Sequence, residues 1–127
     1  MQKGKSVMRY PEYNLAMNNT FSRIKKSDLF PFIKKIIIYG SCARDEIRNE
    51  DNYFGSRSDI DLFFVLDDSI NITNRMILDL RTEIAVDEDT YMEIDSRFTI
   101  GDNWETSKSI YFDEIRKDGI ILWERNV

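Results

Sequence analysis

Histidine is absent from this 127-residue chain. Its absence excludes Ser-His-Asp catalysis, a histidine general base and the zinc and iron sites that depend on imidazole ligands. The single cysteine, Cys42, can form neither an internal disulfide nor a cysteine-only metal site. Carboxylates acting with a hard cation such as Mg²⁺ are the main chemistry that remains.

Long apolar runs are also missing. No run approaches the roughly 20 residues that a membrane-spanning helix needs, and the start of the sequence lacks the apolar stretch of a secretory signal. We therefore expect no membrane association and a cytoplasmic location. A net charge of −5 and a pI near 4.8 argue against general binding to nucleic acid.

The apolar pattern predicts one domain, residues 13–127, after an N-terminal arm of residues 1–12 that we expect to be mobile. Helices are predicted at residues 13–26, 73–85 and 107–117, and a further helix is expected to begin within residues 42–47. Strands are predicted at residues 35–39, 60–66, 91–98 and 120–123. This mixture of elements predicts an α+β fold, an α/β sandwich in which a β-sheet packs against helices.

Several of these elements also have predicted inward faces. The strand at residues 60–66 is apolar on both faces and is expected to be central, whereas the strand at residues 91–98 has one polar face. Gly119 is the expected C-terminal cap of the last helix. The residues predicted to face inward from the three helices are Leu15, Met17, Phe21 and Ile24; Met76, Ile77, Leu80 and Ile84; and Ile110, Tyr111 and Ile115.

Two short motifs adjoin the two most apolar predicted strands. A Gly40-Ser41 turn follows the first strand, and Asp59 and Asp61 stand at the start of the second. Successive side chains of a strand point to opposite faces, so Asp59 and Asp61 emerge on the same face. Two adjacent like charges repel unless a cation lies between them, and Mg²⁺ takes few carboxylates while keeping substrate phosphates as ligands. The sequence therefore predicts a metal site, with the Gly40-Ser41 turn as a phosphate cradle beside it.

Three stretches around these motifs resemble the minimal nucleotidyltransferases of the DNA polymerase beta superfamily. They are residues 36–44, 58–65 and 118–124, which contain an apolar strand, Gly-Ser, Arg, Ser-Asp-x-Asp and a second apolar strand in this order. The resemblance covers roughly residues 20–125. It implies a mixed sheet with helices on one side, similar to the palm of polymerase beta, that holds a nucleoside triphosphate and two Mg²⁺ ions.

The resemblance also implies roles for individual residues. Gly40 and Ser41 match the pair whose backbone amides and hydroxyl hold the triphosphate, and Asp59 and Asp61 match the metal-binding aspartates. Arg44 follows the pair and is expected either to bind phosphate or to pair with a neighbouring acid. One metal would lower the pKa of an acceptor hydroxyl while the other steadies the pyrophosphate leaving group.

A third carboxylate is expected from the strand at residues 91–98, on which Glu93 and Asp95 share a face. Asp95 is the predicted residue, because in similar proteins the acid lies a little before a turn and an acidic-aromatic pair that residues 103–105 resemble. It would bind the catalytic metal and help to take the proton of the acceptor. Glu93 is the alternative.

Two features depart from the family pattern. The spacing from Ser41 to Asp59 is longer than is usual in minimal members, and Asp45 stands where a Gly often follows the Arg. The extra residues, about 49–57, are expected to form a loop, hairpin or lid beside the nucleotide, or to reflect a loss of catalysis.

The acceptor is expected to lie on another molecule or a second copy, because 127 residues leave no room for an acceptor-binding domain. Small relatives of this type are often antitoxins that transfer AMP to a tyrosine of a helical HEPN-type toxin. The resemblance thus predicts a Mg²⁺-dependent nucleotidyltransferase that uses ATP and adenylylates a protein partner. The alternatives are a catalytically silent module that neutralises its partner by contact, and a homodimeric nucleotidyltransferase that acts on a small molecule.

Overall fold

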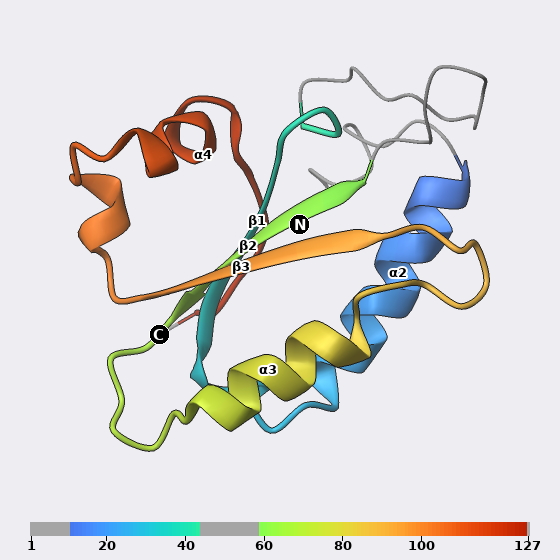
Figure 1. Ribbon diagram of the computed structural model, residues 1–127, viewed down its shortest axis with the longest axis horizontal. Coiled ribbons are helices and arrows are strands. Elements are labelled where there is room, and N and C mark those ends of the chain that lie inside the picture. Colours follow the sequence, from blue (N-terminus) through green and yellow to red (C-terminus); the bar gives the residue numbers. More distant parts are fainter. Residues whose placement is uncertain (1–10, 44–58, 127) are drawn as a thin grey trace.

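A four-stranded mixed sheet forms the centre of the molecule in the computed structural model, which describes residues 11–43 and 59–126 (Figure 1). Its strands lie in the order β3-β2-β1-β4. β1 pairs antiparallel with β2 and β4, whereas β2 and β3 run parallel. The strand bounds are β1 (Ile33–Tyr39), β2 (Ile60–Leu66), β3 (Ile94–Ile100) and β4 (Ile120–Glu124). The predicted α+β fold is confirmed, as is the central position of β2.

Two long helices, α2 (Pro11–Lys25) and α3 (Asn74–Glu83), cover one face of the sheet (Figure 1). Pro11 occupies the first position of α2, where its missing N–H costs no hydrogen bond. Thr73 caps α3, because its hydroxyl accepts a hydrogen bond from the Met76 amide at 3.2 Å. The apolar stripe predicted for α3 is confirmed, with Leu80 and Ile84 buried and Met76 and Ile77 packed against the same core.

The opposite face carries a smaller apolar cluster beneath short helical segments. These segments are η2 (Asn103–Glu105), η3 (Ile110–Phe112) and α4 (Asp113–Asp118), while η1 (Phe30–Phe32) precedes β1. Ile37, Phe63 and Val65 of the central strands pack here against Trp104 and Ile115. Helices therefore lie on both faces, which corrects the expectation of helices on one side. The reason is that β1 and β2 are apolar on both faces and need cover on each.

The buried side of α2 differs from the predicted stripe. Leu15 is 46% exposed, whereas Tyr13, Ala16 and Thr20 are fully buried. These residues share one side of a helix, but the prediction followed the large apolar residues and overlooked an alanine and a threonine. The remaining predicted residues do contact the core: Met17, Phe21 and Ile24.

The predicted helix at residues 107–117 is shorter and begins with a 3₁₀ turn. The Ser109 hydroxyl accepts a hydrogen bond from the Tyr111 amide at 3.2 Å, which starts this turn. Because a 3₁₀ helix has fewer residues per turn than an α-helix, the facing of the side chains changes. Ile110 and Tyr111 are 85% and 49% exposed, so their predicted inward orientation is wrong, whereas Ile115 is buried as predicted. Gly119 is the C-terminal cap of α4, as expected.

β3 begins later than the predicted strand at residues 91–98. Tyr91 has a φ of 60° and its amide donates to the Asp87 carbonyl at 2.7 Å, so the chain turns here instead of extending. Met92 is nevertheless buried, and the predicted alternation of side chains starts from it. Most of the N-terminal arm and the segment predicted as a loop or lid, residues 49–57, lie outside the described residues.

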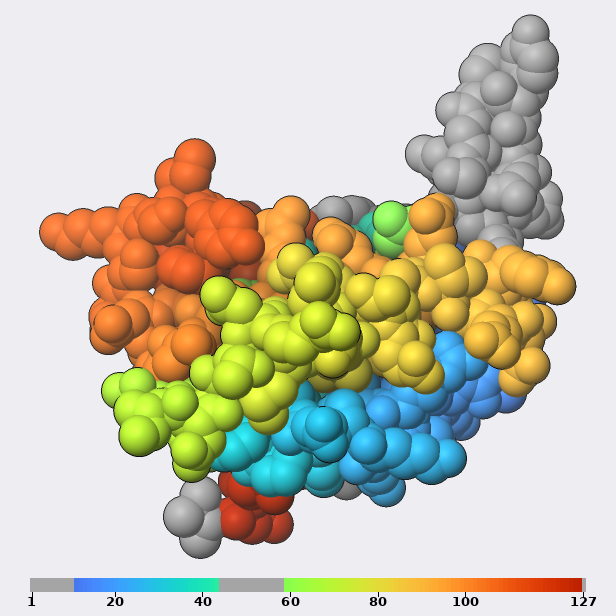
Figure 2. All heavy atoms as spheres, turned by 60° about the horizontal axis from the view of Figure 1, so that its bottom comes forward, coloured from blue at the N-terminus to red at the C-terminus, as the bar shows by residue number. Residues whose placement is uncertain are grey.

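Figure 2 shows α3 lying beside the end of α2 on the outer side of the molecule. A shallow groove between them is lined by Arg23 and Lys26 from one side and by Asp79 and Glu83 from the other. Among the helices of the two described segments, none combines the length and apolar character that crossing a bilayer requires.

Asp87 is a buried carboxylate that ties the loop before β3 to α2. It accepts hydrogen bonds from Asn19 Nδ2 at 3.0 Å, from the Thr90 amide at 2.9 Å and from Thr90 Oγ1 at 2.6 Å. Arg23 lies 4.0 Å away and donates to the Val86 carbonyl at 3.2 Å. Burial alone would raise the pKa of Asp87, but the hydrogen bonds and the charge of Arg23 lower it overall.

We expect Asp87→Asn to reduce the free energy of unfolding by about 1–3 kcal/mol at pH 7, because an amide cannot accept all of these hydrogen bonds. A carboxyl group whose pKa is lowered by folding stabilises the protein above its ordinary value of 3.8. This contribution is lost as the pH falls through the folded-state pKa, so the difference between wild type and variant should shrink near pH 3. Chemical denaturation at both pH values measures it.

Asp89→Asn is the matched control, since Asp89 accepts one exposed hydrogen bond from the same Asn19, at 2.8 Å. We expect it to change the free energy of unfolding by no more than about 0.5 kcal/mol. Equal losses for Asp87→Asn and Asp89→Asn would contradict the role given to Asp87.

Candidate active site

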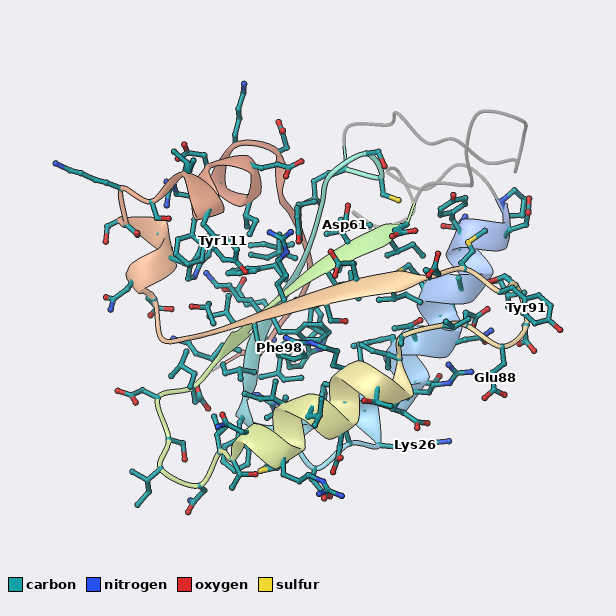
Figure 3. The ribbon with its side chains drawn as sticks, viewed as in Figure 1. Lys26, Asp61, Glu88, Tyr91, Phe98 and Tyr111 are labelled. Atoms are coloured by element: carbon teal, nitrogen blue, oxygen red, sulfur yellow. The ribbon has the colours of Figure 1, made fainter. Side chains whose placement is uncertain are left out.

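Three polar side chains lie in a row across β1, β2 and the edge strand β3, on the face that carries α4. Tyr39 of β1 is in register with Asp61 of β2, and Asp61 is in register with Asp95 of β3. Asp59 and Arg97 join the same face, because each stands two residues from a member of the row. Figure 3 shows Asp61 near the start of β2, beside the turn that follows β1.

The turn after β1 lies directly against Asp61. Gly40 has a φ of 74°, and a Cβ added to it would overlap the Asp61 carboxylate, so only glycine allows this approach. Ser41 follows, half-buried, and the thiol of buried Cys42 reaches the carbonyl of Asp59 at 3.6 Å. Burial raises the pKa of Cys42 to about 12, so the thiol stays neutral. The structure thus brings the two halves of the predicted motif together.

The carboxylates of this face are electrostatically strained. The pKa of Asp61 is raised to about 6, first by burial and then by the charges of Asp95, Asp59 and Glu114. The pKa of Asp59 is raised as well, by desolvation and by nearby carboxylates. Arg97 acts on Asp61 in the opposite direction. A divalent cation would relieve this mutual repulsion.

The donor chemistry of the group fits Mg²⁺, because Asp59, Asp61 and Asp95 supply only oxygen. Among the described residues, however, no three His, Cys, Asp or Glu side chains converge closely enough to hold an ion. The Asp59 and Asp95 side chains are exposed, so packing does not fix their rotamers. The three carboxylates therefore lie near one another and have suitable donor atoms, but their oxygens do not converge on a single point.

Strand register distinguishes the two candidates for the third carboxylate. Asp95 lies directly opposite Asp61. Glu93 precedes β3, where its carbonyl accepts a hydrogen bond from the Ile60 amide at 3.0 Å, and its charge acts on Asp59. The role of Asp95 remains a prediction. Arg44, the predicted phosphate ligand, lies outside the described residues.

Arg97 is a member of this face that the sequence interpretation did not single out. Its guanidinium carbon lies 5.8 Å from the centre of the Tyr39 ring and 5.2 Å from that of Tyr111. Its Nε is 3.9 Å from Asp95 Oδ2. The sequence held one signal for its position: side chains alternate along β3, and this alternation places residue 97 on the same polar face as Asp95.

A protein-family model described as polymerase beta, nucleotidyltransferase matches residues 22–127. The chain belongs to this nucleotidyltransferase family. The predicted membership of the polymerase beta nucleotidyltransferases is therefore confirmed, and the carboxylate face lies within the matched region. A search of curated proteins gave no match.

Two of the solved structures that match this chain illustrate the fold that they share with it. One is a toxin–antitoxin with AMP-PNP, at 17% identity and a TM-score of 0.53, covering 85% of this chain and 73% of that one. The other is the toxin–antitoxin MntA-HpeT, in a mutant where two aspartates separated by one residue are glutamates. It has 16% identity and a TM-score of 0.53, covering 85% of this chain and 72% of that one. At these identities the likeness concerns the fold alone.

We expect Gly40→Ala to destabilise the protein and to abolish Mg²⁺-dependent binding of AMP-PNP, because the new Cβ displaces Asp61. Gly101→Ala is the matched control, since Gly101 also has a positive φ, 77°, but its Cβ would meet no atom within 4 Å. The control should lose only about 1–2 kcal/mol of stability from backbone strain and keep its binding. Thermal unfolding and calorimetric titration measure both effects. Equal binding by the two variants would contradict the contact.

The stability of the metal-free protein should fall as the pH rises from about 4 to about 6. Folding raises the pKa of Asp61 from 3.8 to about 6, so the folded state holds this proton more tightly than the unfolded state. Asp61→Asn removes the effect, and its melting temperature should exceed that of wild type more at pH 7.5 than at pH 4. Asp68→Asn, at the other end of β2, is the control. Parallel pH profiles for wild type and Asp61→Asn in EDTA would contradict the assignment.

Proposed function

We propose that this nucleotidyltransferase depends on Mg²⁺ and transfers AMP from ATP to a hydroxyl group of a partner protein. The observation that supports this most is the packing of the Gly40 turn against Asp61, which stands beside Asp95. A turn able to bind phosphate is thereby in contact with carboxylates able to bind metal. Phosphoryl transfer needs this combination of charge neutralisation and positioning more than it needs a side-chain nucleophile.

Asp59, Asp61 and Asp95 would hold the metal ions in this proposal. When bound, Mg²⁺ supplies charge neutralisation at the phosphates and lowers the pKa of the acceptor hydroxyl. The backbone amides of Gly40 and Ser41, together with the Ser41 hydroxyl, hold the triphosphate. These N–H groups are hydrogen-bond donors at a turn beside the carboxylates, an arrangement that suits a phosphate group.

Asp95 is the group that we expect to receive the proton of the acceptor. It lies on β3, on the far side of Asp61 from β1 and its turn, so an acceptor on that side meets Asp95 first. Its side chain is 50% exposed, which leaves it open to an incoming hydroxyl. Receiving the proton at an oxygen of Asp95 makes the acceptor oxygen a stronger nucleophile.

A protein acceptor is supported by two observations. Two of the solved structures that match this chain are toxin–antitoxin assemblies, one of them with an ATP analogue, AMP-PNP. In addition, Ile110 and Tyr111 are exposed on η3, beside Arg97 of the carboxylate face. Exposed apolar side chains next to a site suit contact with another protein. By the family resemblance, the partner we propose is a helical HEPN-type toxin, and this chain is its antitoxin.

The test is transfer of label from [α-³²P]ATP to the protein that co-purifies with this chain. We expect Asp59→Asn and Asp61→Asn each to reduce labelling by about 1,000-fold or more, because the phosphate charge is then no longer neutralised. EDTA should have the same effect on wild type. Asp68→Asn, an exposed carboxylate after the end of β2, is the control and should label at the wild-type rate.

Full labelling in EDTA, or by the Asp61→Asn variant, would contradict the proposal. If wild type binds the partner but neither binds AMP-PNP with Mg²⁺ nor transfers AMP, the chain acts by contact alone and the catalytic proposal is wrong.

A further inference from the structure

Among the described residues, Arg97 is the cation that acts on the acids of the carboxylate face. The charges that raise the pKa of Asp61 come from Asp95, Asp59 and Glu114, and the charge that lowers it comes from Arg97. A nucleotide approaching this face meets negative charge. Metal ions and the amides of the Gly40 turn would offset part of this repulsion, and a protein cation at the same place would offset more of it.

Two aromatic rings hold the Arg97 guanidinium in place. Tyr39 is buried in β1, whereas Tyr111 is half-exposed on η3, and their ring centres lie 5.8 and 5.2 Å from the guanidinium carbon. Arg stacks well on tyrosine faces and stays charged at every accessible pH. A side chain ordered in advance by two rings loses less conformational entropy when it binds a ligand.

The hydrogen-bonding capacity of Arg97 is unused by the described residues. Its nearest charged partner there is Asp95 at 3.9 Å, which is beyond hydrogen-bond distance, and its guanidinium donates no hydrogen bond to them. The side chain is 40% exposed. A guanidinium presents five N–H donors in a planar fork whose geometry matches a phosphate group.

The strand register sets Arg97 and the Gly40 turn on opposite sides of the Asp61–Asp95 pair. Tyr39 pairs with Asp61, so Gly40 lies beyond Asp61 toward the start of β2. Arg97 pairs with Phe63, one step further into the sheet from the Asp61–Asp95 pair. An anion above that pair therefore has the turn on one side and Arg97 on the other.

We propose that Arg97 is a catalytic residue that donates hydrogen bonds to a non-bridging oxygen of the α-phosphate, the phosphoryl group that is transferred. This inference rests on the proposed function. If the turn holds the remaining phosphates and the acceptor enters beside Asp95, the α-phosphate lies between them, within reach of Arg97. Charge builds up on that group in the transition state, and Arg97 stabilises it.

The experiment compares Arg97→Gln and Arg97→Lys with wild type, using ATP and the two diastereomers of ATPαS, in which sulfur replaces one α-phosphate oxygen. We expect Arg97→Gln to lower kcat for AMP transfer about 100-fold, and Arg97→Lys about 10-fold because it keeps the charge and loses the fork. The Kd for AMP-PNP in the presence of Mg²⁺ should change less than about 3-fold, because the contact with Arg97 matters mainly in the transition state.

The rate ratio of the two diastereomers separates a contact with the phosphate from a structural role. It should change several-fold in Arg97→Gln, because one of the two oxygens loses its donor. Arg81→Gln is the matched control, since Arg81 also lies over a ring, that of Phe98 at 5.4 Å, but from α3 on the opposite face of the sheet. It should leave kcat and the ratio unchanged.

If Arg97→Gln does not fold, judged by its melting temperature, Tyr111→Leu replaces it, because it removes an exposed ring that holds the guanidinium. It should lower kcat about 3- to 10-fold and shift the same ratio, as expected when a charged donor is displaced. An unchanged kcat or an unchanged diastereomer ratio in the folded Arg97 variants would overturn this inference alone. A wild-type protein that transfers no AMP would overturn the proposed function and this inference with it.

Discussion

The close approach of the Asp61 carboxylate to the backbone of Gly40 is the constraint on which the site depends. It requires a residue without Cβ after β1, a positive φ at that residue and a strand register that sets Tyr39 opposite Asp61. Because the carboxylate is half-buried there and faces Asp95, its ionised form is disfavoured. This cluster of like charges thus destabilises the folded protein, which is typical of sites that bind cations.

The two faces of the sheet divide structure from chemistry. α2 and α3 bury the even-numbered side chains of β2, such as Leu62 and Phe64, in the larger core. Among the described residues, the odd-numbered side chains pack against short segments, so this face is apolar under α4 at Phe63, and Asp61 is half-buried. Because the strands are firmly packed on the other face, the backbone that carries the charged groups moves little, and their positions are well defined.

The sequence predicted the local parts of the site and not the parts that depend on tertiary contacts. Gly40 and Asp61 were identified because a turn residue and a charge at a strand end are readable from spacing alone. The choice between Glu93 and Asp95 was not readable in this way, since it depends on how β3 registers against β2. Arg97 escaped notice for a similar reason: Tyr39 and Tyr111, which hold it, are far apart in the sequence.

The central claim is that one nucleotide and its metal ions bind between the Gly40 turn and the Asp61–Asp95 pair. The most direct measurement is a crystal structure with AMP-PNP and Mn²⁺, in which anomalous scattering locates the metal. The account predicts Mn²⁺ bound by Asp61 and Asp95, with the triphosphate against Gly40 and Ser41. Metal and nucleotide bound elsewhere on the protein, with this face empty at saturating concentrations, would contradict it.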